Sequence, residues 1–236
     1  MPSFEHAPGL VVQYNGPAPR LGDFKLMVFD MDSTLINIEC VDEIADAAGL
    51  KAQVAAITEA TMQGVITDFK DSLRQRVALL RGIPVAHLEQ VYAERLQLNP
   101  GAQVLVNAAR DAGLKTLLVS GGFTFFADRV KTTLGIDFAR SNQLEIKDGI
   151  LTGRLVDQCW GDICDGAEKR RTLLELASLM GIAPAQAIAV GDGANDLPMM
   201  GVAGLSVAYH AKPKVRAQAH VAINEGGLDR LLEWLR

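Results

Sequence analysis

Cysteine and histidine are both scarce in this sequence, and neither is spaced for metal binding. The 236 residues include four histidines and three cysteines, Cys40, Cys159 and Cys164. A disulfide framework or a zinc site needs paired short spacings with further Cys or His partners, and no two histidines stand four residues apart as in a helical metal clamp. We therefore expect three reduced thiols, as in a protein of a reducing compartment.

Long apolar runs and an excess of positive charge are also missing. No run approaches the ~18 residues of a membrane-spanning helix, and no charged stretch followed by an apolar one opens the chain. Acidic residues outnumber basic ones by 28 to 23, so the net charge of -5 argues against a nucleic-acid or anionic-membrane partner. The composition predicts a globular cytoplasmic protein that binds neither nucleic acid nor membrane.

Short apolar stretches alternate with helical patterns over most of the chain. Strands separated by helices predict the α/β class, with a mostly parallel sheet covered on both faces. Asp148-Gly149, between two further β-rich stretches in 143–156, predicts a small additional hairpin. The strand-like runs of the main sheet are residues 25–30, 116–120, 187–192, 205–208 and 220–223.

The patterns divide the chain into three parts. Residues 1–22 are rich in Pro and Gly and lack periodicity, which predicts an extended N-terminal leader. Residues 40–97 have a helical pattern without a convincing strand, which predicts a helical cap domain inserted after the first strand. The remaining residues, 23–39 and 98–236, are expected to form a Rossmann-like core domain.

Three predicted strands end in chemically capable groups. Asp30 and Asp32 follow the first strand, Ser120 and Gly121 follow the second, and Asp192 opens the run Asp-Gly-Ala-Asn-Asp after a third. The carboxyl ends of parallel strands line one crevice, so these groups should converge. Carboxylates two residues apart on an extended strand face the same side and repel each other unless a cation or a proton shares the site. Oxygen ligands without His or Cys favour Mg²⁺, which in turn implies a phosphate-bearing substrate.

The chain resembles the haloacid dehalogenase superfamily over residues 25–236. Its phosphatases carry D-x-D-x-[TV] after the first strand, Ser or Thr after the second, a Lys and a late acidic motif. Here these correspond to Asp30-Met31-Asp32-Ser33-Thr34, Ser120, Lys169 and the run from Gly191 to Asp196. The stretches "FDMDSTLINIECVDEIA", "SLRQRVALL", "VSGGF" and "VGDGANDLPMM" are more closely similar to the phosphoserine phosphatase family.

The resemblance implies a role for each of these residues. Asp30 would attack phosphorus to form an aspartyl-phosphate, and Asp32 would act first as general acid and then as general base. Ser120, Gly121, Lys169 and Asn195 would bind the phosphoryl group or its surroundings. Mg²⁺ would be held by Asp30, Asp32 and Asp192, with Asp196 in or near its outer shell.

Helical periodicity independently supports a role for Lys169 at the site. Lys169 shares an apolar face with Leu173, Ala177 and Met180, so its side chain should point inward near the start of its helix, where an anion would have to offset its charge. A boundary lysine that reaches out to water is the alternative, with Arg170 as the runner-up for the role.

Helical periodicity likewise supports a role for Arg76 at the site. It interrupts the stripe of Phe69, Leu73 and Leu80, whereas Arg74 should project away from that stripe. An inward arginine suits the carboxylate of an amino acid, and an ion pair within the cap is the alternative.

Three further residues, one just before the cap and two within it, depend mainly on the resemblance for their roles. Glu39, nine residues after Asp30, would bind the substrate ammonium, although its position alone suggests a solvated helix start. Met62 and Phe69 match positions that shield the site, but helix core is an equally good interpretation.

We therefore expect an enzyme that uses Mg²⁺ to hydrolyse O-phospho-L-serine to L-serine and phosphate, the last step of serine biosynthesis, as a monomer or homodimer. One alternative is a phosphatase or phosphotransferase acting on another small phosphomonoester, in which Glu39 and Arg76 would be idle. The other alternative is a phosphoserine sensor without catalytic activity. The presence of both Asp30 and Asp32 argues against it.

Overall fold

The computed structural model describes residues 3–62 and 65–236, and its centre is one large sheet. The strand order is β1-β2-β10-β9-β8-β3-β4-β5, and neighbours from β10 through β5 pair in parallel. These strands are β1 Phe4–Ala7, β2 Leu10–Val12, β3 Leu26–Phe29, β4 Lys115–Phe123, β5 Phe138–Asn142, β8 Ala187–Gly191, β9 Leu205–Tyr209 and β10 Val221–Ile223. The predicted α/β class with a mostly parallel sheet is confirmed.

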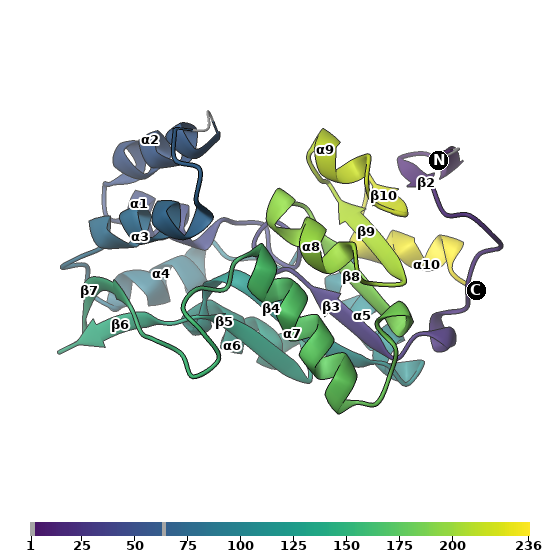
Figure 1. Ribbon diagram of the computed structural model, residues 1–236. Helices are drawn as coiled ribbons and strands as arrows, with labels where there is room; N and C mark the ends of the chain where they lie inside the picture. Colours follow the sequence, from purple (N-terminus) through teal and green to yellow (C-terminus); the bar gives the residue numbers. More distant parts are fainter. Residues whose placement is uncertain (1–2, 63–64) are drawn as a thin grey trace.

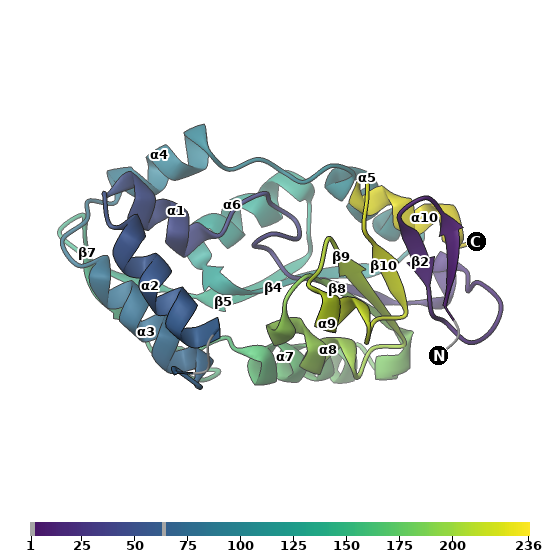
Figure 2. The ribbon, with the colours of Figure 1, turned by 90° about the horizontal axis from the view of Figure 1, so that it is seen from above.

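Helices cover both faces of this sheet, with α7 and α8 on one side and α5 and α6 on the other (Figures 1 and 2). The alternation of side chains along β3 accounts for this arrangement, since Leu26 and Val28 enter one apolar cluster and Met27 and Phe29 the other. The bounds of these helices and of two shorter ones are α5 Ala102–Asp111, α6 Thr124–Leu134, α7 Gly166–Leu179, α8 Leu197–Met200, α9 Pro213–Arg216 and α10 Leu231–Trp234. Short 3₁₀ turns are η1 Leu21–Asp23, η2 Pro184–Gln186, η3 Ala194–Asp196 and η4 Leu228–Arg230.

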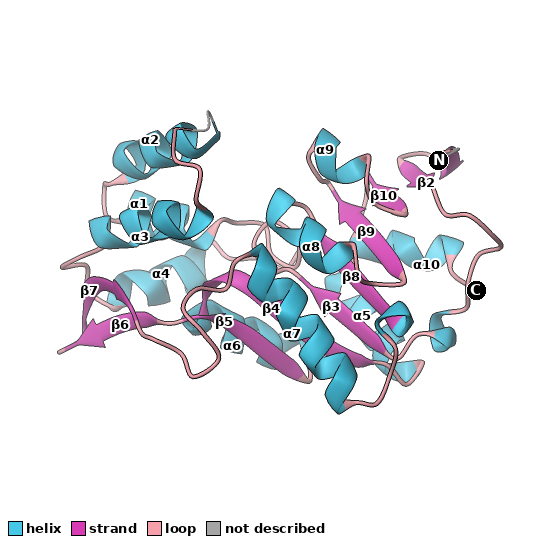
Figure 3. Cartoon of the chain, viewed as in Figure 1, coloured by secondary structure: helices cyan, strands magenta, loops and turns pink. Residues whose placement is uncertain are grey.

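The chain between β3 and β4 is helical, as its pattern predicts, and we call residues 40–97 the helical insert. Figure 3 shows its helices gathered at one end of the sheet. They are α1 Cys40–Ala47, α2 Lys51–Met62, α3 Phe69–Leu79 and α4 Ala86–Glu94. Helix α3 also packs against the hairpin of β6 (Leu144–Lys147) and β7 (Ile150–Leu155), which confirms the hairpin predicted at Asp148-Gly149.

The expectation of an extended leader over residues 1–22 is wrong for its first half. Strands β1 and β2 form a hairpin through Pro8-Gly9, and β2 pairs antiparallel with β10 at the edge of the sheet. Gly9 adopts a positive φ of 73°, and the apolar residues after it are buried at Leu10 and Val12. The Pro-Gly pair is therefore the turn of a short hairpin, not the sign of a linker.

Strand β5 was also absent from the prediction. Its sequence, FARSN, lacks an apolar run because β5 is an edge strand, and Phe138 is 41% exposed. None of the described helices is both long and apolar enough to span a membrane. All three cysteines have free thiols, as expected.

Candidate active site

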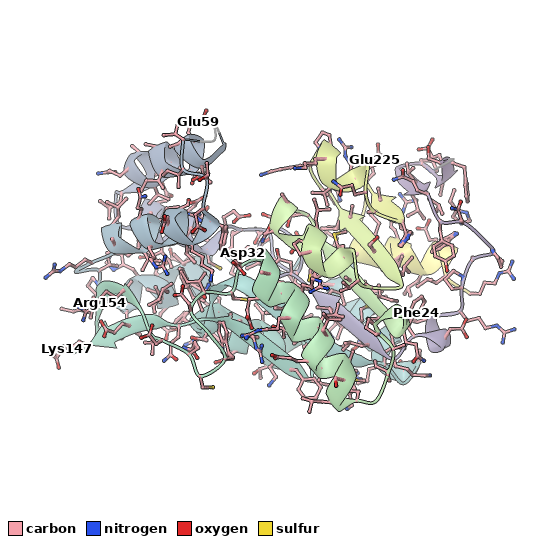
Figure 4. The ribbon with its side chains drawn as sticks, viewed as in Figure 1. Phe24, Asp32, Glu59, Lys147, Arg154 and Glu225 are labelled. Atoms are coloured by element: carbon pink, nitrogen blue, oxygen red, sulfur yellow. The ribbon has the colours of Figure 1, made fainter. Side chains whose placement is uncertain are left out.

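The carboxyl ends of β4, β3 and β8 lie next to one another and carry the predicted polar groups. Asp30 directly follows β3, Ser120 lies in β4 three residues before its end, and Asp192 directly follows β8. They line a cavity of about 400 Å³ together with residues of the helical insert. Figure 4 shows Asp32 where the insert meets the core. The convergence predicted from three separate strand ends is therefore present.

Asp30 is held in a fixed orientation by two donors at one of its oxygens. Its Oδ1 accepts a hydrogen bond from the backbone N–H of Met31 at 2.7 Å and lies 2.7 Å from Lys169 Nζ. No hydrogen bond reaches Oδ2 in the described part of the chain. Burial raises the pKa of Asp30 well above its ordinary value, the charge of Asp196 raises it further, and Lys169 opposes both effects. Oδ2 is thus the oxygen left available to a metal or to phosphorus.

Lys169 points inward, as its helical face predicts. It is fully buried on α7, and its Nζ lies 2.7 Å from Asp196 Oδ1 as well as from Asp30. Burial lowers the pKa of Lys169, but the two carboxylates outweigh burial and leave it above its ordinary value. Arg170, the runner-up, is exposed.

The loop after β8 is organised by Asp196. Its Oδ2 accepts hydrogen bonds from the backbone N–H groups of Asp192 at 3.1 Å and Gly193 at 3.0 Å. A Cβ atom at Gly191 would lie 2.4 Å from Asp196 Cγ, so this close approach requires glycine. Asp192 Oδ1 accepts a hydrogen bond from Thr34 Oγ1 at 3.1 Å, and burial, followed by the charge of Asp196, raises the pKa of Asp192 to about 6.

Three carboxylates at this point could hold a metal ion. Ligand atoms of Asp30, Asp192 and Asp196 all lie within 4.8 Å of one another, and Lys169 is the basic side chain in contact with them. Three carboxylates beside one ammonium leave an excess of negative charge, which adds to burial, the larger cause, in raising the pKa of Asp30 and of Asp192. The donor set of oxygen atoms fits a hard divalent cation. Since both oxygens of Asp196 are already engaged, Asp30 and Asp192 are the better ligands.

The carboxylate of Asp32 has different surroundings from that of Asp30. Its Oδ2 accepts a hydrogen bond from the backbone N–H of Cys40 at 3.2 Å, and its Oδ1 from the thiol of Cys40 at 3.1 Å. Burial, and next the charge of Glu39, raise the pKa of Asp32 to about 7. The acidic cluster of Asp30, Asp192 and Asp196 does not include the Asp32 carboxylate, so a role for Asp32 in metal binding stays a prediction.

The second strand end supplies polar groups around the acids. The side chain of Ser120 is buried, and its Oγ accepts a hydrogen bond from the backbone N–H of Gly122 at 2.8 Å. A Cβ atom at Gly121 would lie 3.1 Å from Phe69 Cζ of the helical insert and 3.3 Å from the carbonyl oxygen of Cys164. Asn195 lines the cavity from the loop after β8. These positions agree with a phosphate-binding role for Ser120, Gly121 and Asn195, which stays a prediction.

The helical insert and the residue just before it contribute charges of both signs to the cavity. Glu39 is the N-cap residue of α1, and its Oε1 accepts a hydrogen bond from Ser33 Oγ at 2.7 Å. Arg76 lines the cavity from α3, and burial lowers its pKa. Within the described residues no carboxylate lies at salt-bridge distance from Arg76, in contrast to Arg74, which pairs with Asp71 and Asp162 at the surface.

Two residues expected to shield the site have different outcomes. Phe69 lines the cavity, whereas the side chain of Met62 lies outside the described residues. Several residues of the site received no role from the sequence, and three of them bear on its polar contacts. They are Thr34, which contacts Asp192, Cys40, which holds Asp32, and Asp42, which lines the cavity. Thr34 could have been found because it completes the D-x-D-x-T motif.

Known proteins share both this sequence and this fold. Residues 27–201 match the family described as haloacid dehalogenase-like hydrolase. A phosphoserine phosphatase of Polaromonas sp. is 71% identical, with 98% of each chain covered. Two solved structures, a substrate-bound phosphoserine phosphatase and a phospho-aspartyl intermediate analogue of phosphoserine phosphatase, each superpose with a TM-score of 0.82 at 37% identity, covering 90% of this chain and 99% of theirs. By sequence and by fold, this chain belongs to the haloacid dehalogenase-like hydrolases.

Proposed function

We propose that this chain is a phosphoserine phosphatase, which hydrolyses O-phospho-L-serine to L-serine and phosphate through an aspartyl-phosphate. The observation that carries the proposal is one cavity with two kinds of wall. Its core wall holds the Asp30 and Asp32 pair. Its insert wall holds Arg76 together with Glu39, the residue just before the insert. A simple phosphate ester would make no use of the second wall. The relatives of the same name, at up to 71% identity, support the substrate.

In the first step Asp30 attacks phosphorus. A bond forms between a carboxylate oxygen of Asp30 and phosphorus while the bond from phosphorus to the seryl oxygen breaks. Asp32 gives its proton to that seryl oxygen, and serine leaves as an alcohol. A pKa near 7 suits Asp32 for this role, because a useful fraction of the acid stays protonated at neutral pH.

In the second step a water molecule resolves the intermediate. Asp32, now a carboxylate, takes a proton from the water, whose oxygen bonds to phosphorus as the bond to Asp30 breaks. Phosphate departs and both aspartates are restored. Lys169 keeps Asp30 oriented and offsets its charge throughout.

The metal would be held by Asp30 and Asp192, and Mg²⁺ is the ion we propose. When bound, it neutralises negative charge that develops on the phosphoryl oxygens. Ser120, Gly121 and Asn195 are proposed to contact the same oxygens, since all three line the cavity beside Asp30. Arg76 is proposed to pair with the substrate carboxylate and Glu39 with its ammonium.

We also propose that the helical insert is a cap domain and that residues 23–39 and 98–236 form the core domain. The contact of Phe69 with the Gly121 region supports a cap that covers the phosphoryl group. A cytoplasmic location agrees with three free thiols, and a monomer or homodimer stays the expectation.

Phosphate release from a panel of esters tests the proposal. The panel contains L-phosphoserine, phosphothreonine, a sugar phosphate and 4-nitrophenyl phosphate, each assayed with Mg²⁺ and with EDTA, for the wild type and for Asp30→Asn. We expect Mg²⁺-dependent turnover with the highest kcat/KM for L-phosphoserine and none by the variant. A higher kcat/KM for another ester would retain the chemistry and refute the substrate.

A further inference from the structure

Three buried polar atoms on the insert wall of the cavity lack a hydrogen-bond partner in the described part of the chain. They are Asp42 Oδ1, Thr58 Oγ1 and Arg76 Nε, and all three residues line the cavity. Buried polar atoms are nearly always paired, so each exception calls for an explanation. Three exceptions on one wall indicate that a ligand supplies the missing partners.

Neighbouring polar groups on the same wall do not share this property. Thr61 and Ser72 also line the cavity, and their hydroxyl oxygens lie 2.7 Å apart in a hydrogen bond. The wall is therefore able to pair its polar groups internally. The unpaired atoms of Asp42, Thr58 and Arg76 are therefore not a consequence of loose packing along this wall.

Asp42 and Arg76 do not satisfy each other. They have opposite charges and line one cavity, yet no salt bridge joins them in the described residues. Their opposite charges attract each other, but Asp42 Oδ1 and Arg76 Nε are each left without a hydrogen-bond partner among the residues that the structure describes. Arg76 offers a donor that suits a carboxylate, and Asp42 offers an acceptor that suits a cation.

The position of Asp42 relative to Glu39 identifies that cation. Glu39 is the N-cap of α1 and Asp42 lies three residues later in the first turn, so both carboxylates come from one end of one helix. An ammonium group has three N–H donors, and one oxygen of Glu39 is already occupied by Ser33. A single glutamate therefore leaves the ammonium of an amino acid short of acceptors.

Building on the proposed function, we propose that Asp42 is a specificity-determining residue that accepts a hydrogen bond from the substrate ammonium, beside Glu39. An unpaired carboxylate next to Arg76 offers no hydrogen-bond partner to a ligand that carries only a carboxylate. It attracts one in which an ammonium lies beside the carboxylate, which is the arrangement of an α-amino acid.

Four phosphate esters separate the two charges of the substrate. L-phosphoserine carries both, phosphoethanolamine carries the ammonium alone, 3-phosphooxypropanoate carries the carboxylate alone, and 4-nitrophenyl phosphate carries neither. Asp42→Asn should lower kcat/KM by about 10- to 100-fold for the two esters with an ammonium. For the other two esters the change should stay within about threefold.

Asp46→Asn is the matched control, because Asp46 lies on the same helix but pairs with Arg95 and Lys51 and does not line the cavity. Asp46→Asn should leave kcat/KM unchanged for all four esters. Asp42→Ala also removes the oxygen that asparagine would still offer as an acceptor. It should therefore lower kcat/KM for the two esters with an ammonium at least as much as Asp42→Asn does. Unchanged turnover of 4-nitrophenyl phosphate shows that both Asp42 variants fold.

The remaining outcomes overturn the inference. A loss confined to the esters with a carboxylate would mean that Asp42 positions Arg76, equal losses on all four esters would mean a structural role, and no loss would mean no role. The wild-type values test the proposed function separately. If the wild type turns over 4-nitrophenyl phosphate but not L-phosphoserine, that function fails whatever Asp42 does.

Discussion

Replacement of Lys169 by methionine should destabilise the fold far more than an ordinary substitution on a helix. The ammonium is fully buried and lies 2.7 Å from carboxylate oxygens of both Asp30 and Asp196. Methionine fills a similar volume but leaves two buried carboxylates without their cation, with Asp192 close by. Removal of one partner from a buried ion pair costs about 3–5 kcal/mol. Since domains are stable by only about 5–15 kcal/mol, this is a large share of the total.

Urea unfolding in EDTA at pH 7.5, followed by circular dichroism, measures the effect. With an m-value of about 3 kcal/mol per M, the midpoint should fall by about 1 to 1.7 M. Arg170→Met changes the same type of charge at an exposed neighbouring position, and its free energy of unfolding should stay within about 0.5 kcal/mol of the wild type. Added Mg²⁺ should raise the midpoint more in Lys169→Met than in the wild type, because the variant site is more negative. A loss under about 1 kcal/mol would refute the view that Lys169 neutralises this cluster.

Three further changes test other parts of the structure. Asp32→Asn removes the proton donor, so kcat/KM for L-phosphoserine should fall by about 10²- to 10⁴-fold. For 4-nitrophenyl phosphate, whose leaving group needs no proton, kcat/KM should fall less, and equal losses of kcat/KM for the two esters would contradict a general-acid role. Gly204→Ala places a Cβ 1.9 Å from the carbonyl oxygen of Ala185 and should cost about 1–3 kcal/mol in thermal unfolding, whereas Gly22→Ala, with open space, should be tolerated; similar values would show that the backbone adjusts. Burial lowers the pKa of His220, whose Nδ1 accepts from Ser206 N–H, so the stability it contributes is complete above the unfolded pKa and is lost as pH falls through the folded one. His220→Asn should therefore weaken the decline of the melting temperature between pH 7.5 and 5, and an unchanged decline would exclude His220 as its source.

Most of the correct predictions about the fold and the site came from apolar periodicity and from the polar residues at strand ends. The burial of β3 follows from its continuous apolar run, and the buried face of α7 follows from a helical stripe that also predicted an inward Lys169. The convergence of Asp30, Ser120 and Asp192 follows from parallel topology, because the carboxyl ends of adjacent strands share one edge. Such features depend on local pattern together with one general rule of architecture.

Features that depend on pairing between distant segments were not predictable in this way. Strands β1 and β2 are short and rich in turn residues, and β2 becomes a strand because β10 offers an edge far away in the sequence. Likewise, nothing in a single sequence indicates that the thiol of Cys40 reaches Asp32 or that Asp42 Oδ1 is left unpaired. Those facts depend on how α1 meets the end of β3.

The junction of α1 with β3 connects substrate recognition to the chemistry. Helix α1 begins at Cys40, and the amide and thiol of Cys40 hold both oxygens of Asp32. The same first turn carries Asp42, and Glu39 is its N-cap. Any shift of α1 on binding an amino acid would therefore also move the donors that orient the general acid. A phosphate ester without the amino-acid charges gains no such contact with α1, so the position of this helix gives the site a physical means to favour its substrate at the chemical step as well as in binding.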